Sequence, residues 1–251
     1  MANPHVRSKL HFYPEDSGKE LNEAYQAKQW LKEMDPTQLT PMIRLHNQDF
    51  FVFEPTLLSD GQVCMPIRWF QHKELFFAKA WPLRAVVNDT GCGWIVEGHR
   101  EIEISQAELL VSFKNWRVSQ STCALPPAEN IIGMFYLTIF YASYSKIIIG
   151  IEKSGEGGLQ LEPWTLTKPC EGNRWHALAN GARVYGFPIW LYCDDTSGNL
   201  SKRWNKHNSF LFTPAGLPRA AVHQEYNVHF LCTSNTAPPL EMLDGVVNQL
   251  E

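Results

Sequence analysis

The chain has 251 residues, of which 44% are hydrophobic and 19% are charged, so it can bury a core and is not a disordered chain. Its 22 Lys and Arg against 26 Asp and Glu give a net charge of −4, which excludes a uniformly basic nucleic-acid-coating protein but not a local basic patch. The six cysteines form no Cys-x-x-Cys pair, which argues against a structural zinc site and favours reduced, mostly buried thiols. Residues 1–11 are polar, so we expect no signal peptide and an intracellular protein.

Residues 1–116 are expected to form a small N-terminal α+β module. Two capping-box spacings, Ser17 with Glu20 and Ser105 with Glu108, each predict the start of a helix. Runs of apolar and β-branched residues separated by turn formers predict hairpins. The expected elements in chain order are a helix over 19–33, a hairpin of 50–53 with 63–70 turning at 59–61, a hairpin of 83–87 with 94–96, and a short helix over 109–111.

Residues 117–180 are expected to be an irregular linker or insert. The stretch 131–151 carries one charged residue, Lys146, and is as long as the roughly 20 apolar residues that span a bilayer. Its Ser, Thr and Tyr content and its β-branched end favour a buried strand pair or an irregular insert, and a membrane anchor is the weaker alternative. A second hypothesis for part of this stretch is that residues 133–150 are translated intron.

Residues 181–251 predict three antiparallel strands followed by a helix. The predicted strands are 187–193, 210–213 and 227–233, and the helix is 240–250. The first strand runs into Asp194 and Asp195, where a rigid strand can hold a carboxylate for a hard cation, although the following residues are also typical of a plain turn. The predicted fold is α+β, with the N-terminal module followed by a partial ribonuclease-H-like unit.

A basic cluster follows this carboxylate pair. It combines cations with one large aromatic side chain and consists of Lys202, Arg203, Trp204, Lys206 and His207. Such a loop can contact the phosphate backbone and stack on a base, and an ordinary solvated hairpin loop is the alternative.

The run YCDDTSGNLSKRWNKH over residues 192–207 resembles the Plavaka-type transposases of fungal genomes, a branch of the CACTA-like transposases. Their pattern reads DDxSGNxSKxWNKH, and the resemblance extends over residues 11–116 and 180–251. It implies a metal-dependent DNA transposase with a ribonuclease-H-like core that uses Mg²⁺ or Mn²⁺. Asp194 would be the catalytic metal ligand, with Asp195 as the alternative. Lys202, Lys206 and His207 would approach the DNA, with Trp204 packed or stacked beside it.

The chain departs from that family after residue 251, where the later carboxylates would follow. Glu241 and Asp244, on the expected helix, are interpreted as solvated residues or as partners of the dipole at the helix N-terminus. We therefore expect a transposase fragment in the nucleus that binds DNA, needs no small-molecule cofactor and does not cut DNA alone. The alternatives are a non-catalytic DNA-binding or assembly module, with self-association through unpaired strand edges, and the membrane-anchored protein. The transposase interpretation requires the aspartate pair to lie near the centre of the three-stranded sheet.

Overall fold

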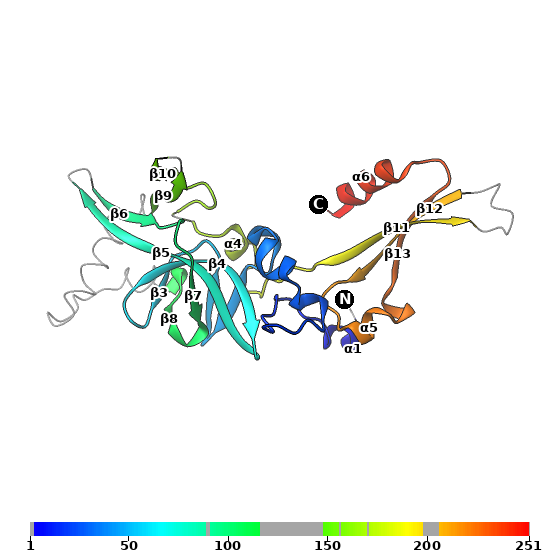
Figure 1. Cartoon of the computed structure of the whole chain (residues 1–251), viewed down its shortest axis with the longest axis horizontal. Coiled ribbons are helices and arrows are strands. Elements are labelled where there is room, and N and C mark those ends of the chain that lie inside the picture. The colour runs from blue at the N-terminus through cyan, green and yellow to red at the C-terminus, as the bar shows by residue number, and fades with distance from the viewer. Residues whose placement is uncertain are drawn as a thin grey trace.

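The computed structural model describes residues 3–88, 91–115, 148–155, 157–169, 171–197 and 206–250. Figure 1 shows an elongated molecule with a strand-rich unit at one end and a three-stranded sheet with helices at the other. This arrangement confirms the α+β class, with strands as the dominant element.

The strand-rich unit contains two sheets. Its strands are β1 Met42–Leu45, β2 Gln48–Phe51, β3 Thr56–Leu58, β4 Val63–His72, β5 Leu75–Asn88, β6 Gly91–Val96, β7 Ile102–Ser105, β8 Leu109–Val111, β9 Ile148–Gly155 and β10 Gly158–Glu162. Strands β1 and β2 form a hairpin, and the larger sheet has the order β10-β9-β6-β5-β4-β3-β8, with β7 also paired to β5. The 14-residue β5 thus contacts three other strands, and apolar residues including Phe50, Met65, Trp69 and Trp94 fill the core that this sheet surrounds.

The strand predictions for this unit are confirmed in part. The hairpin of 83–87 with 94–96 is present, with Leu83 opposite Val96. The turn at 59–61 also forms, but it joins β4 to β3 rather than to residues 50–53. Residues 48–51 instead pair with β1, because His46 and Asn47 adopt positive φ values of 46° and 62° and make a tight hairpin turn.

The two predicted helices of this unit are wrong. In place of a helix over 19–33 the chain has a 3₁₀ turn, η1 Ala24–Gln26, and a π turn, η2 Gln29–Glu33, with an extended Ala27 between them. The buried Arg68 guanidinium, which donates hydrogen bonds to the carbonyls of Leu31 and Met34, stabilises this irregular path. The capping box of Ser105 and Glu108 exists, but it closes the 3₁₀ turn η4 Gln106–Glu108, and β8 follows because its residues pair with β3.

The C-terminal unit confirms the predicted order of three antiparallel strands and a helix. The strands are β11 Ile189–Ser197, β12 Lys206–Pro214 and β13 His229–Ser234, followed by α6 Pro239–Leu250. The sheet order is β11-β12-β13. The first strand continues through Asp194 and Asp195 to Ser197, so the pair lies within the strand rather than in a turn.

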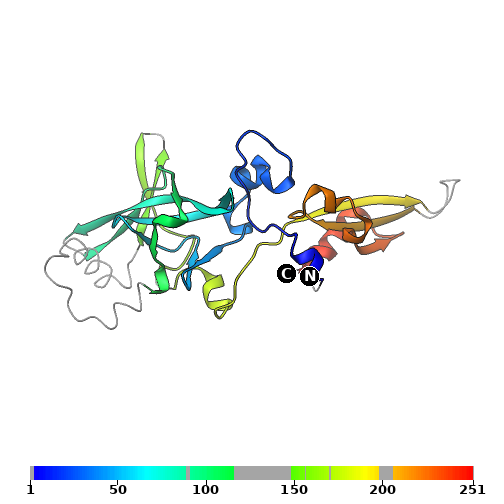
Figure 2. The ribbon, with the colours of Figure 1, turned by 90° about the horizontal axis from the view of Figure 1, so that it is seen from below.

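The N-terminal segment runs between the two units, as Figures 1 and 2 show from two directions. Its backbone pairs with the C-terminal unit where the His11 N–H donates to the Gly216 carbonyl at 2.8 Å. A Cβ at Gly216 would lie 2.0 Å from the carbonyl oxygen of His11, so only glycine permits this close approach of the two backbones. On the other side, the Gln71 N–H of β4 donates to the Pro14 carbonyl at 2.8 Å. The segment therefore ties the strand-rich unit to the three-stranded sheet.

The remaining helical elements of the described residues are short. They are α1 Pro4–Arg7, the 3₁₀ turns η3 Pro36–Gln38 and η6 Glu225–Asn227, α4 Arg174–Leu178 and α5 Arg219–Val222. Among helices of the described residues, none combines the length and the apolar character that crossing a membrane requires. Most of the proposed anchor 131–151 and intron 133–150 lies outside the described residues. Their last residues begin β9, which runs parallel to β6 and antiparallel to β10.

Candidate nucleic-acid interface

The two candidate catalytic aspartates occupy adjacent positions in the second half of β11. Asp194 is opposite Ser209 and Asp195 is opposite Asn208 on β12, and both aspartates are exposed. Because successive residues of a strand face opposite sides of the sheet, the two carboxylates do not converge on one point. Asp194 Oδ1 accepts a hydrogen bond from the Asp195 backbone N–H at 2.8 Å.

Asp194 opens onto a shallow hollow on one face of the sheet. The lining combines side chains of β11 and β12 with residues that follow β12, including Tyr192, Leu211 and His223. A carboxylate oxygen is a suitable donor for Mg²⁺ or Mn²⁺. However, within the described ranges no group of three or more His, Cys, Asp or Glu residues could hold a metal ion. The donor chemistry fits a divalent cation, but these residues do not complete its coordination.

Strand β11 lies at the edge of the three-stranded sheet, and β12 is the central strand. The expectation that the aspartate pair lies near the sheet centre is therefore wrong for this sheet. The Ala215 N–H donates to the Pro188 carbonyl at 2.9 Å. This bond shows which residues direct their backbone groups toward β12: Pro188, directly before β11, and every second residue after it. In an antiparallel pair every second residue bonds to its partner strand, so the backbone N–H and C=O groups of Leu191 and Cys193 face away from β12.

The basic cluster is only partly described. Lys202, Arg203 and Trp204 lie outside the described residues, between β11 and β12. Lys206 is the first residue of β12, and His207 is opposite Thr196, one position from the Asp195–Asn208 pair. The hairpin thus brings the acidic pair and the start of the basic segment into adjacent cross-strand positions.

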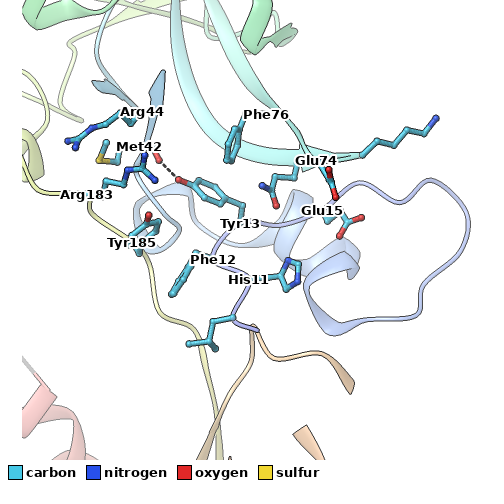
Figure 3. Close-up of a pocket in the computed structure, with 13 residues that line it drawn as sticks. His11, Phe12, Tyr13, Glu15, Met42, Arg44, Glu74, Phe76, Arg183 and Tyr185 are labelled. Carbon is cyan, nitrogen blue, oxygen red and sulfur yellow. Dashed lines mark hydrogen bonds between the residues drawn. The ribbon is translucent and has the colours of Figure 1, made fainter. Parts of the chain in front are cut away.

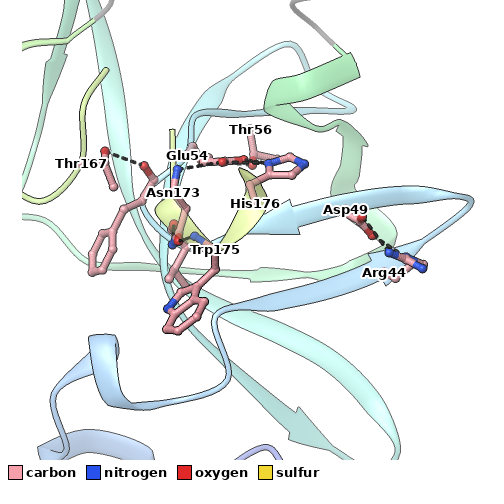
Figure 4. Close-up of polar contacts among 10 residues, drawn as sticks. Arg44, Asp49, Glu54, Thr56, Thr167, Asn173, Trp175 and His176 are labelled. Carbon is pink, nitrogen blue, oxygen red and sulfur yellow. Dashed lines mark hydrogen bonds and ion pairs between the residues drawn. The ribbon is translucent and has the colours of Figure 1, made fainter. Parts of the chain in front are cut away.

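A buried polar cluster in the strand-rich unit carries no sequence signal. Glu54 is 1% exposed. Its Oε1 accepts a hydrogen bond from the Asn173 N–H and lies 2.9 Å from His176 Nδ1 (Figure 4). The His176 ring stacks on Phe51 at 4.4 Å, and Asn173 Nδ2 donates to the Val52 carbonyl at 2.9 Å. These residues are about 120 positions apart in sequence, so only folding brings them together. The cluster holds α4 against the turn between β2 and β3.

A cavity of about 500 Å³ lies where the N-terminal segment, the strand-rich unit and residues 183–185 meet (Figure 3). Its walls carry aromatic rings, two arginines at one end and two glutamates at the other. No local sequence pattern predicts this cavity, because its lining residues come from four separated segments of the chain.

Three cysteines are described as free thiols: Cys64 is buried, Cys232 is half-buried and Cys193 is exposed. The expectation of reduced cysteines is met for these three, while that of burial fails at Cys193, which lies on the edge strand. Burial raises the pKa of the Cys64 thiol well above its ordinary value, with smaller contributions from Asp60 and Glu108.

Residues 42–185 match a family described as Domain of unknown function (DUF8591), and the chain belongs to this family. The matched range covers the strand-rich unit and ends before β11. No curated protein and no solved structure matches the chain.

Proposed function

We propose that this member of the DUF8591 family is a transposase-derived DNA-binding protein whose C-terminal unit corresponds to the first part of a ribonuclease-H-like core. The observation that carries the proposal is the succession of three antiparallel strands and a helix, with Asp194 on the first strand. The basic cluster begins in the chain between β11 and β12 and ends with Lys206 and His207 on β12. A DNA ligand implies a nuclear location.

The edge position of β11 does not meet the requirement for a central aspartate strand, so the proposal covers only the first part of such a core. A first strand that becomes central needs a further strand along its outer side, and within the described sheet β11 pairs with β12 only. Since the described carboxylates do not complete a metal site, we derive no cutting step. The proposed activity is DNA binding, and Asp194, or alternatively Asp195, is the position that would bind Mg²⁺ or Mn²⁺.

DNA binding is tested by fluorescence anisotropy of a labelled duplex with the full chain. Changing both Lys202 and Lys206 to Ala removes two cations, so we expect at least 10-fold weaker binding at low salt and a shallower salt dependence. The matched control changes Lys153 and Lys168 to Ala in the strand-rich unit and leaves binding nearly unchanged. Equal losses in both double variants, or no duplex binding by the parent, would contradict the proposal.

Metal binding is tested by titrating Mn²⁺ while recording tryptophan fluorescence, since Trp190 lies on the same strand as Asp194. We expect a weak response that Asp194→Ala abolishes and Glu20→Ala, at an exposed carboxylate elsewhere, retains. A response that persists in Asp194→Ala and disappears in Asp195→Ala assigns the ion to the alternative residue. Mg²⁺-dependent cleavage of supercoiled plasmid that is lost in Asp194→Ala would falsify the expectation of a non-cutting protein.

Assembly with a second copy is the other candidate function, and the edge of β11 favours it. Trp190, Leu191 and Tyr192 are 47%, 38% and 46% exposed, and the outer backbone groups of Leu191 are directed away from β12. Exposed apolar edge strands pair readily with another chain. Antiparallel pairing about Leu191 places Trp190 of each copy opposite Tyr192 of the other and separates the acidic residues, whereas parallel pairing would align them.

Light scattering coupled to gel filtration tests this assembly. We expect a dimer that becomes a monomer in Leu191→Lys, because a charge on the paired edge opposes association. The matched control Leu21→Lys changes an exposed leucine outside the strands and retains the dimer. A monomeric parent chain at all concentrations, or a dimer that survives Leu191→Lys, would exclude this edge as the interface.

A further inference from the structure

The cavity between the units has walls from four segments of the chain. They are residues 10–15, β1, the tip of the β4–β5 hairpin, and residues 183–185 (Figure 3). Its volume of about 500 Å³ is within the range of about 300–1,000 Å³ that is usual for small-ligand sites. The cavity is distinct from the aspartate pair and from the basic cluster on the β11–β12 hairpin.

Aromatic rings form the middle of the cavity. Tyr13 is held in place, because its hydroxyl donates to the Met42 carbonyl at 2.7 Å and its ring meets Phe76 edge-on at 4.9 Å. Tyr185 contacts Phe12 with ring centroids 4.6 Å apart and keeps 38% of its surface exposed. Tyr185 therefore presents an aromatic surface that is supported from behind and accessible to a planar ligand.

The two arginines and the two glutamates of the cavity lie toward opposite ends, and Lys73, next to Glu74 in the chain, also lines it. Figure 3 shows Arg44 and Arg183 beside the Tyr13 hydroxyl, and Glu15 and Glu74 beyond the other side of that ring. Arg44 is committed to Asp49, with Nη2 to Oδ2 at 2.8 Å, whereas no contact of this kind is found for Arg183 among the described residues. Arg183 thus has donors available for an anion at the mouth of the cavity.

We propose that this cavity binds one deoxynucleotide of an unpaired DNA strand, with the base against the accessible face of Tyr185, which Phe12 supports from behind, and a phosphate on Arg183. The inference rests on the proposed DNA-binding function and names a second contact for it. A base stacked on an aromatic ring and a phosphate on a guanidinium are the usual elements of single-strand recognition. The carboxylates of Glu15 and Glu74 can accept hydrogen bonds from the amino group of a base. Bases within a duplex are stacked on each other and do not offer their faces to such a site.

The test measures binding of a labelled 12-nucleotide single strand and of the matching duplex to the full chain. We expect Tyr185→Ala and Arg183→Ala each to weaken single-strand binding about 10-fold, because each removes a stacking or phosphate contact. Duplex binding should remain unchanged. Two matched controls should bind the single strand like the parent: Tyr185→Phe, which keeps the ring, and Arg174→Ala, which removes an exposed arginine on α4 outside the cavity.

The outcomes separate this inference from the proposed function. Duplex binding that depends on Lys202 and Lys206, together with single-strand binding that is unaffected by Tyr185→Ala and Arg183→Ala, overturns the cavity assignment and leaves the proposed function intact. If the parent chain binds neither the single strand nor the duplex, both the cavity assignment and the proposed function are overturned. Equal losses in Arg174→Ala and Arg183→Ala indicate general electrostatics and also overturn the assignment.

A competition experiment distinguishes binding of a nucleotide within a strand from binding of a free nucleotide. If dAMP displaces the labelled strand and deoxyadenosine does so less well, the phosphate contact is supported. If dAMP binds in a Tyr185-dependent manner but the strand does not bind, the unpaired-strand proposal is overturned in favour of a free nucleotide.

Discussion

The two units of the molecule treat their large apolar side chains in opposite ways. In the strand-rich unit Trp69 is 1% exposed within a core that strands surround. In the three-stranded unit Trp190 is 47% and Phe230 is 61% exposed. A sheet of three strands with one helix along it leaves much of its surface uncovered. Among the described residues, the first unit therefore encloses its large apolar side chains, whereas the second leaves several of them exposed.

The largest expected effect is the loss of a tryptophan from the closed core. Trp69→Ala should lower the free energy of unfolding by about 3–5 kcal/mol, because it removes a fully buried ring and leaves a cavity. Trp190→Ala should lower it by less than about 1 kcal/mol. Urea denaturation followed by circular dichroism measures both. Similar losses for the two variants would contradict the contrast between the units.

Breaking the buried polar cluster around Glu54 should lower the free energy of unfolding somewhat less than Trp69→Ala does. Glu54→Ala removes the acceptor for the Asn173 N–H and the partner of His176, so we expect a loss of about 3 kcal/mol. The control Glu103→Ala removes an exposed carboxylate paired with Lys79 and should cost less than about 1 kcal/mol. Thermal or urea unfolding of both variants checks this, and a Glu54→Ala protein as stable as the parent would show that α4 is held otherwise.

Alkaline pH should affect the closed core through Cys64. Burial keeps this thiol protonated in the folded state, while in the unfolded chain it ionises near its ordinary pKa of about 8.5. Above that pH the folded state binds more protons than the unfolded chain. The contribution of the Cys64 thiol to the free energy of unfolding is therefore complete below that pH and falls by up to about 1.4 kcal/mol per pH unit above it. Comparing stability between about pH 8 and about pH 10, we expect a shallower decline in Cys64→Ala.

The exposed Cys193 is the matched control for this pH effect. Cys193→Ala should keep the decline of the parent, because this exposed cysteine lies on the edge strand β11 and leaves the buried Cys64 unchanged. If stability declines equally with pH in Cys64→Ala and in the parent, the Cys64 proton does not contribute to the pH dependence of stability.

The smallest effect is expected at the surface of the strand-rich unit. Lys153 and Glu162 form an ion pair of 2.6 Å between β9 and β10, and both side chains are about half exposed. Lys153→Ala should therefore change stability by less than about 1 kcal/mol, with less effect still in high salt. A double-mutant cycle with Glu162→Ala measures the pair, and a coupling above 2 kcal/mol would show that this edge is more rigid than its exposure implies.

Strands and turns were predicted best where the signal is local. The hairpin of 83–87 with 94–96 and the C-terminal order of three strands and a helix depend on short apolar runs between turn residues, and both are present. The helix over 19–33 failed because Arg68, which lies far along the chain, binds the Leu31 carbonyl and stabilises an irregular path. Local periodicity carries no information about such a contact.

The candidate site shows the same division. The sequence pattern predicted Asp194 and Asp195 directly after a strand that ends at residue 193, with a plain turn as the alternative, whereas the pairing with Ser209 and Asn208 places both within β11. Two features could not be read from the sequence: their position at the sheet edge, and the lack, among the described residues, of a group of three or more side chains that could hold a metal ion. Ligand groups assemble through long-range packing.

By itself the amino-acid sequence determined the α+β class, the elements of the C-terminal unit and the residue types available for binding, because these follow from composition and from patterns within about ten residues. Only the tertiary structure decided that Glu54 meets His176, that β11 is an edge strand and that Tyr185 and Arg183 line one cavity. Each of these depends on segments that are distant in sequence, and their meeting is selected by the packing of the whole chain rather than by any local preference.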